Sequence, residues 1–168
     1  MEDIIYIACD DSGLQAKEEI IHYLQEHHYK YLDCGSGAEA SRYPYYAAKV
    51  AAAVSEGKIR RGILICASGI GMSIAANKFR GVRASLVTDP YAAQLTRRHN
   101  NSNVLCLAGQ MSGPWAICKI LENWLTTDYE GGKHQGSLDL IAQMEAAMMG
   151  ETLWCPEEIP YPPFSWKD

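Results

Sequence analysis

The segment ILICASGIGMSIAAN, residues 63–77, constrains the fold more than any other part of this chain. It opens with three apolar residues, a run typical of a strand that is covered on both faces. The run ends at Cys66, and small residues then lead into a helical pattern. A buried strand, a glycine turn and a helix form the repeating unit of a parallel sheet. The segment therefore predicts a strand-turn-helix unit with a thiol at its turn.

Similar units recur along the chain. The sequence pattern predicts strands over residues 4–9, 29–33, 62–66, 84–87 and 104–108. Helices are expected over residues 13–27 and 44–54, from about residues 71, 90 and 113, and over residues 137–149. Strands that alternate with helices through short connections favour a parallel sheet covered by helices on both faces. We therefore expect an α/β fold with five parallel strands.

The composition fits one globular domain. The 168 residues are 48% hydrophobic and 21% charged, enough to build a core over residues 1–150, with a tail rich in aromatic residues and proline over residues 151–168. A formal net charge of −5, with no Lys/Arg run longer than a pair, argues against nucleic acid as a partner. No segment resembles a signal peptide or is apolar for long enough to cross a bilayer. We expect a cytoplasmic protein without a membrane partner.

The six cysteines do not form a framework. They lie at positions 9, 34, 66, 106, 118 and 155, without a CxxC pair or metal-ligand spacing, so neither a disulfide scaffold nor a metal site is indicated. Cys9 and Cys106 lie in apolar runs and are expected to be small buried hydrophobic residues. Cys66 differs because it ends a strand beside a glycine loop.

Polar residues follow several elements of the predicted sheet. In parallel α/β folds ligands bind at the carboxyl ends of the strands, so we expect these residues to meet there. They are Asp10 and Asp11 after the first strand, Cys66 and Ser68 after the third, and Arg97 to Asn100 at the end of the helix after the fourth.

The glycine turn itself is suited to an anion. Ser68, Gly69, Gly71 and Ser73 supply small side chains and backbone N–H groups at the start of a helix. Such groups favour a phosphate, or an oxyanion that forms during a reaction.

The stretch from Gly62 to Gly109 resembles the core of the type B ribose-5-phosphate isomerases and the related galactose-6-phosphate isomerases. The resemblance extends to Asp10, to Tyr43-Pro44 and to the sequence YEGGKH at residues 129–134, and it covers about residues 4–149. It implies a Rossmann-like three-layer α/β/α sandwich and a homodimer or homotetramer with sites at the subunit boundary. It also implies aldose–ketose isomerisation of a sugar or sugar phosphate without a metal or other cofactor.

Such a reaction needs a base for a carbon-bound proton, a stabiliser for the enediolate and a group that opens the sugar ring. The resemblance implies that Cys66 is the base, that N–H groups from Ser68 to Ser73 hold the enediolate oxygen and that His99 opens the ring. The residues implied in substrate binding are Asp10, Asp11, Tyr43 and Asn100, with Lys133 and His134 at the phosphate.

This chain departs from the family pattern at positions close to the substrate. Asp11 replaces a usual histidine, Arg42 a usual acidic residue and Ala67 a usual glycine. Arginines that commonly hold the phosphate are matched here by Gln110, Lys133 and Ser137. Each hydrogen bond to a charged group is worth about 1.5–3 kcal/mol, so these changes weaken a phosphate site of the usual kind.

Three interpretations of the substrate and activity follow. The favoured one is a sugar phosphate held by Lys133 and His134 with Arg42 or Arg98. A second is a different or unphosphorylated sugar whose hydroxyl groups donate to Asp11. A third is a catalytically silent paralogue that binds a sugar, although the presence of both Cys66 and His99 argues against it. A plain dinucleotide-binding module is a weaker alternative, because CDDSG rather than GxGxxG follows the first strand.

Overall fold

The computed structural model describes residues 3–35 and 42–148. Five strands form one parallel sheet in the order β2-β1-β3-β5-β4. They are β1 (Ile5–Cys9), β2 (Tyr31–Asp33), β3 (Arg61–Cys66), β4 (Ala84–Leu86) and β5 (Val104–Ala108). The predicted number and direction of the strands are confirmed. Cys9 pairs with Ile65, and Cys66 with Ala108, so the central strands end at one level.

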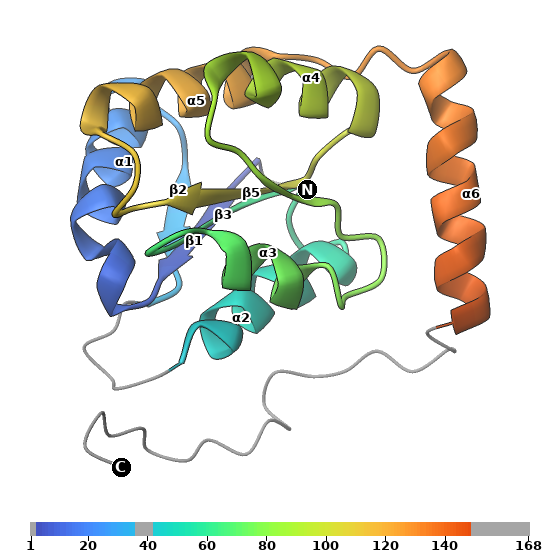
Figure 1. Ribbon diagram of the computed structural model, residues 1–168, viewed down its shortest axis with the longest axis horizontal. Coiled ribbons are helices and arrows are strands. Elements are labelled where there is room, and N and C mark those ends of the chain that lie inside the picture. Colours follow the sequence, from blue (N-terminus) through green and yellow to red (C-terminus); the bar gives the residue numbers. More distant parts are fainter. Residues whose placement is uncertain (1–2, 36–41, 149–168) are drawn as a thin grey trace.

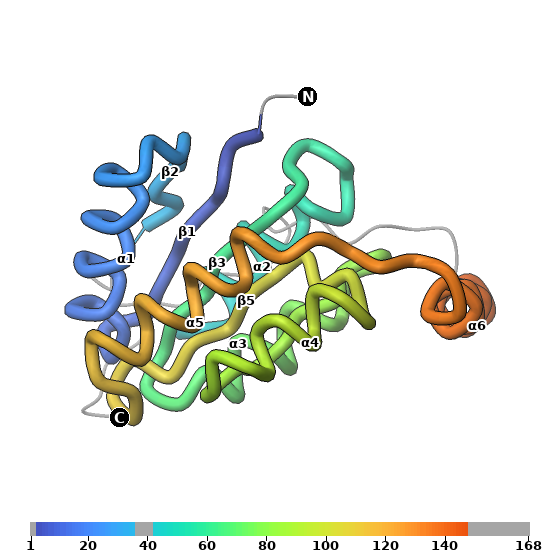
Figure 2. The backbone as a smooth tube through the Cα atoms, turned by 90° about the horizontal axis from the view of Figure 1, so that it is seen from above, coloured from blue at the N-terminus to red at the C-terminus, as the bar shows by residue number. Residues whose placement is uncertain are grey.

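Helices cover both faces of the sheet and make the predicted three-layer sandwich. They are the 3-10 turn η1 (Asp11–Gly13) and the helices α1 (Leu14–Glu26), α2 (Tyr43–Ser55), α3 (Ile70–Ala76), α4 (Pro90–Asn100), α5 (Pro114–Thr126) and α6 (Lys133–Met148). In Figure 1, α4 and α5 lie above the sheet, whereas α2 and α3 lie below it. Figure 2 shows the same sandwich from above, with α6 standing apart at one end.

Two apolar layers hold the sandwich together. Alternate residues of β3 point to opposite faces, so Leu64 packs with α2 and α3 while Ile63 and Ile65 pack with α1 and α5. Trp124 of α5 is fully buried in the second layer. Complete burial of a large aliphatic side chain contributes about 1.5–3 kcal/mol, so these layers fix the strands that carry the site.

Gly62 shows why the start of β3 needs a glycine. A Cβ atom at this position would lie 2.2 Å from Cγ1 of Val50 in α2, so a side chain would force the helix away from the sheet. The close approach of α2 to β3 also brings Tyr43, the first residue of α2, near the carboxyl edge of the sheet.

The last helix starts earlier than the predicted residue 137. Gly131 and Gly132 both have a positive φ, and their carbonyl groups accept the N–H groups of His134 and Gln135. These bonds begin α6 at Lys133 and place His134 in its first turn. The tail that the sequence pattern separates from the domain lies outside the described residues.

Helix α6 contacts the sandwich along a narrow line. The carboxylate of Glu145 accepts the N–H group of Gly81 at 2.9 Å. A cavity of about 400 Å³ lies between helix and body, and Val82, Leu138 and Ile141 contribute to its lining. Among the described helices, none is both long and apolar enough to cross a membrane.

Candidate active site

Cys66 ends β3 inside a tight turn. Its sulfur accepts the N–H group of Gly69 at 3.1 Å, and its side chain is buried, with 6% exposed. Gly69 has a φ of 72°, and a Cβ atom there would lie 2.6 Å from Cδ1 of Leu86 and 3.0 Å from the carbonyl of Leu107. Only glycine therefore fits this turn. The turn aims a backbone dipole at the sulfur, which stabilises negative charge on that atom.

Not every N–H group of the turn is available for an anion. The N–H group of Ile70 donates to Oγ of Ser68 at 3.3 Å, and that of Ser73 donates to the carbonyl of Gly69 at 3.1 Å. The expectation that the donors extend to the N–H group of Ser73 is wrong, because that group closes the first turn of α3. The N–H groups of Gly71 and Met72 have no acceptor among the described residues. Met72 is fully buried whereas Gly71 is partly exposed, so the Gly71 N–H group is the one that a ligand can reach.

Asp10 lies at the same edge of the sheet. Its N–H group donates to the carbonyl of Ile65, the residue before Cys66, at 3.3 Å. Its carboxylate accepts the N–H group of Ser12 at 3.0 Å, and burial raises the pKa of Asp10. Asp11 follows in η1 and is exposed.

Tyr43 of α2 closes the opposite side of the turn. A Cβ atom on Gly71 would lie 2.8 Å from the Tyr43 ring, so the ring rests on the glycine backbone. The structure thus brings together Asp10, Tyr43, Cys66 and the glycine turn, as the sequence predicts.

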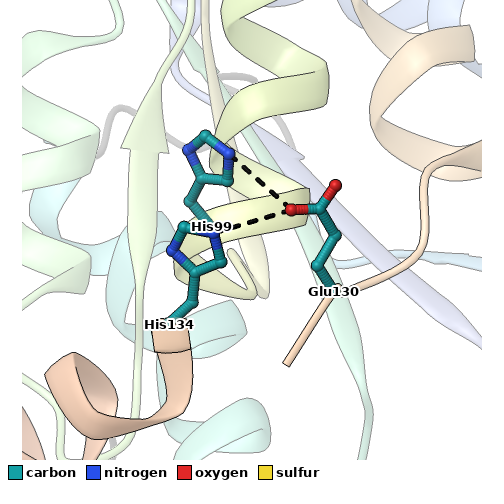
Figure 3. A group of neighbouring side chains, drawn as sticks. All are labelled: His99, Glu130 and His134. Carbon is teal, nitrogen blue, oxygen red and sulfur yellow. Dashed lines mark ion pairs between the residues drawn. The ribbon is translucent and has the colours of Figure 1, made fainter. Parts of the chain in front are cut away.

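A second cluster joins the end of α4 to the start of α6 (Figure 3). The rings of His99 and His134 stack with their centroids 4.2 Å apart and an interplanar angle of 17°. Oε2 of Glu130 lies 3.9 Å from Nε2 of His99 and 3.5 Å from Nε2 of His134. Oε1 of Glu130 accepts a hydrogen bond from Nε of Arg98 at 2.5 Å, and this bond lowers the pKa of Glu130. Lys133 and Asn100 are exposed nearby in the chain.

This cluster has the residue types of a metal site but not its geometry. One ligand atom from each of His99, Glu130 and His134 lies within 4.8 Å of the others. The two imidazole planes are nearly parallel, however, so their nitrogen lone pairs run side by side instead of converging on one ion. The carboxylate is also engaged by Arg98. The arrangement is better described as an ion-paired histidine cluster.

The group around Cys66 and the histidine cluster lie at opposite ends of the strands. Cys66 lies at the carboxyl ends, and the histidine cluster lies at the amino ends. The carbonyl of Asn103, four residues after His99, accepts the N–H group of Gly62 at the start of β3. Cys66 lies four residues further along β3, about 13 Å away at 3.3 Å per residue. The prediction that the end of α4 meets the carboxyl edge is wrong within one chain. A helix that connects parallel strands runs antiparallel to them, so it ends at their amino edge.

Sequence reasoning did not single out Glu130 as a functional residue. Its position four residues before His134, within the YEGGKH sequence, was the available signal. Arg98, considered there as a phosphate ligand, is paired with Glu130 through both Nε and a terminal nitrogen. Its charge is thereby partly neutralised.

The comparisons with known proteins identify the family of this chain. A family model described as Ribose/Galactose Isomerase matches residues 5–141. Ribose-5-phosphate isomerase B of Escherichia coli is 43% identical over 142 residues, which are 84% of this chain and 95% of that protein.

Two solved structures share the fold. That of the Clostridium thermocellum ribose-5-phosphate isomerase B has a TM-score of 0.83 and 38% identity, covering 86% of this chain and 98% of that chain. That of the Mycoplasma genitalium enzyme, with bound ribulose-5-phosphate, has a TM-score of 0.82 and 37% identity, covering 86% and 97%. The present chain therefore belongs to the ribose/galactose isomerase family, and it is an aldose–ketose isomerase.

Proposed function

We propose that this protein interconverts the aldose and ketose forms of a five-carbon sugar phosphate, ribose 5-phosphate and ribulose 5-phosphate, with Cys66 as the base. The observation that carries the proposal is the turn after β3, where the Gly69 N–H group contacts the Cys66 sulfur and those of Gly71 and Met72 are unpaired among the described residues. The named activity of the Escherichia coli relative and the ligand of the Mycoplasma genitalium structure support this choice of substrate.

The proposed reaction uses first the thiol and then the backbone N–H donor of the turn. The Cys66 thiolate removes the proton from C2 of the open-chain aldose, and the electron pair of that bond moves into a C1–C2 double bond while the carbonyl oxygen becomes an enediolate. The N–H group of Gly71, which is partly exposed, holds this oxygen. The thiol then returns the proton to C1, and the proton of the C2 hydroxyl group passes to the oxygen at C1, so that a carbonyl forms at C2 and a hydroxyl group at C1.

We further propose that two copies of the chain complete each site. His99, Lys133 and His134 lie at the edge opposite Cys66, so one copy does not bring them to the substrate. Large apolar side chains are exposed on the two helices that begin at these clusters, among them Ile70 and Ile74 of α3 and Met144 of α6. Such surfaces are buried in oligomers. In a homodimer, Cys66 of one copy faces His99 of the second copy.

The phosphate end is assigned to the cluster that contains His99. Lys133 and His134 begin α6, and both can donate hydrogen bonds to phosphate oxygens. Because Arg98 is paired with Glu130, this site has less free positive charge than an arginine cluster would supply. That observation keeps an unphosphorylated sugar, bound at Asp11, as the second candidate.

A substrate panel in D2O tests the proposal. The purified chain is given ribose 5-phosphate, ribulose 5-phosphate and the corresponding free sugars, and deuterium incorporation at C1 and C2 is followed by NMR. Turnover and exchange with the phosphorylated pair alone support the proposal, and both should vanish in Cys66→Ala. Preference for a free sugar would support the second candidate. Binding without exchange would identify a silent sugar-binding protein.

The cellular location is a further proposal. Five cysteines fall within the described residues, and none of them forms a disulfide there. Free thiols are typical of the reducing cytosol, which is where we place this enzyme.

A further inference from the structure

Among the described residues, Glu130 contributes the carboxylate that approaches both imidazoles of the second cluster (Figure 3). We propose that Glu130 is a positioning residue for sugar ring opening: its carboxylate favours one orientation of the stacked His99 and His134 rings. This inference rests on the proposed function, in which His99 opens the ring. It adds a role that the two histidines alone do not explain.

Glu130 is held in place through both its backbone and its side chain. Its N–H group donates to the carbonyl of Arg98 at 3.1 Å, and its Oε1 accepts from Nε of Arg98 at 2.5 Å. Arg98 precedes His99 on the same turn of α4. The carboxylate is therefore tied to the element that carries His99, with Oε2 directed at the two rings. At 3.9 Å from His99 and 3.5 Å from His134 the carboxylate makes ion-pair contacts, and a negative charge fixed there favours the ring orientations that turn Nε2 toward it.

The charges around the carboxylate support the same role. Arg98, His99 and His134 all lower the pKa of Glu130, Arg98 most strongly through its hydrogen bond, so Glu130 remains ionised at neutral pH. Lys133 adds positive charge next to His134 in α6. The hydroxyl group of Tyr129 donates a hydrogen bond to Oε1 of Gln135. A carboxylate that stays charged keeps a negative charge in front of the two rings, which are stacked 4.2 Å apart.

Ring opening needs a well-placed group that can transfer protons. The C1–O4 bond of the cyclic aldose breaks as the ring oxygen receives a proton and the anomeric hydroxyl group gives one up, so the cluster has both to donate and to accept. The 5-phosphate of a ketopentose blocks the hydroxyl group that would close a furanose ring. Ribulose 5-phosphate is therefore an open chain, and its deprotonation at C1 does not depend on ring opening.

The test compares these two reactions in Glu130→Gln, which keeps the shape of the side chain but removes its charge. We expect kcat for ribose 5-phosphate to fall about 10- to 100-fold with little change in KM, while C1 exchange of ribulose 5-phosphate in D2O stays close to that of the unmodified protein. Glu130→Asp, which keeps the charge, should restore part of the rate.

The control is Glu122→Gln, which removes a surface carboxylate paired with Lys119 at 2.7 Å on α5 and should change neither reaction. Equal loss of aldose conversion and ketose exchange in Glu130→Gln, or no recovery of the aldose rate in Glu130→Asp, would overturn the positioning role. The proposed function is tested separately by Cys66→Ala. That variant should lose both reactions, and retention of ketose exchange would refute Cys66 as the base whatever the behaviour of Glu130→Gln.

Discussion

Cys66 and His99 lie at opposite ends of the strands of one parallel sheet, Cys66 at the carboxyl ends and His99 at the amino ends. Cys66 ends β3, whereas His99 lies in the last turn of α4. The chain that follows α4 reaches the beginning of β3, where the carbonyl of Asn103 accepts a hydrogen bond from the N–H group of Gly62. The two residues to which we assign one reaction are thus separated by the length of a strand. Under the proposed function each site therefore needs a second copy of the chain, and this dependence can be tested.

The conformation of Gly69 is needed for the turn that contacts Cys66. Gly69→Ala places a Cβ atom 2.6 Å from Leu86 at a φ of 72°, so we expect a loss of about 2–4 kcal/mol of unfolding free energy, from left-handed strain and overpacking together, and a loss of activity. Urea denaturation measures the first effect. Gly57→Ala is the matched control, because its φ is 70° but no atom lies within 4 Å of the added Cβ; it should lose only about 1–2 kcal/mol. Equal losses in both variants would contradict the packing argument.

Asp10 should oppose folding when it is ionised. Burial raises its pKa above the value in the unfolded chain, so the folded state binds the proton more tightly and stability falls as the pH rises from the unfolded to the folded pKa. Asp10→Asn, which can still accept the Ser12 N–H group, should therefore unfold at a higher temperature than the unmodified protein at neutral pH. The difference should disappear at a pH below the ordinary aspartate value of 3.8. Thermal melts across this range measure it, and a gap that persists in acid would contradict the assigned cause.

The exposed apolar face of α3 should form part of the dimer interface. Ile74 is 55% exposed there, and Ile74→Glu would bury a charge in the interface, so we expect dissociation at micromolar concentration with loss of activity. Sedimentation velocity measures the change in mass. Trp115→Gln is the control, because Trp115 is 72% exposed on α5, across the sheet from α3. Dissociation by Trp115→Gln with an intact dimer in Ile74→Glu would show that α5, and not α3, forms the contact.

The sequence was sufficient for the sheet and for the half-site around Cys66. Apolar runs such as residues 63–65 identify the strands, and a thiol before a run of small residues identifies the turn, because both signals are local. The first turn of α6 was missed, since its start depends on two glycine carbonyls instead of a conventional capping side chain.

The second half-site could not be derived in the same way. Glu130 meets Arg98 across 32 residues of sequence, and that contact exists only after α4 has packed and the chain has returned along α5. The place of His99 depends on the direction of α4 relative to the sheet. Both are tertiary relationships, and no pattern within one window of sequence reports them.

The most direct test of the central claim mixes two inactive variants. Cys66→Ala and His99→Ala are purified separately, dissociated together with mild denaturant and allowed to reassociate in equal amounts. Random pairing yields half heterodimers, and each of these contains one intact site, so the account predicts recovery of about a quarter of the unmodified activity. Neither variant treated alone should recover. A mixture that stays inactive, although mass spectrometry shows that heterodimers have formed, would contradict a site shared between two copies.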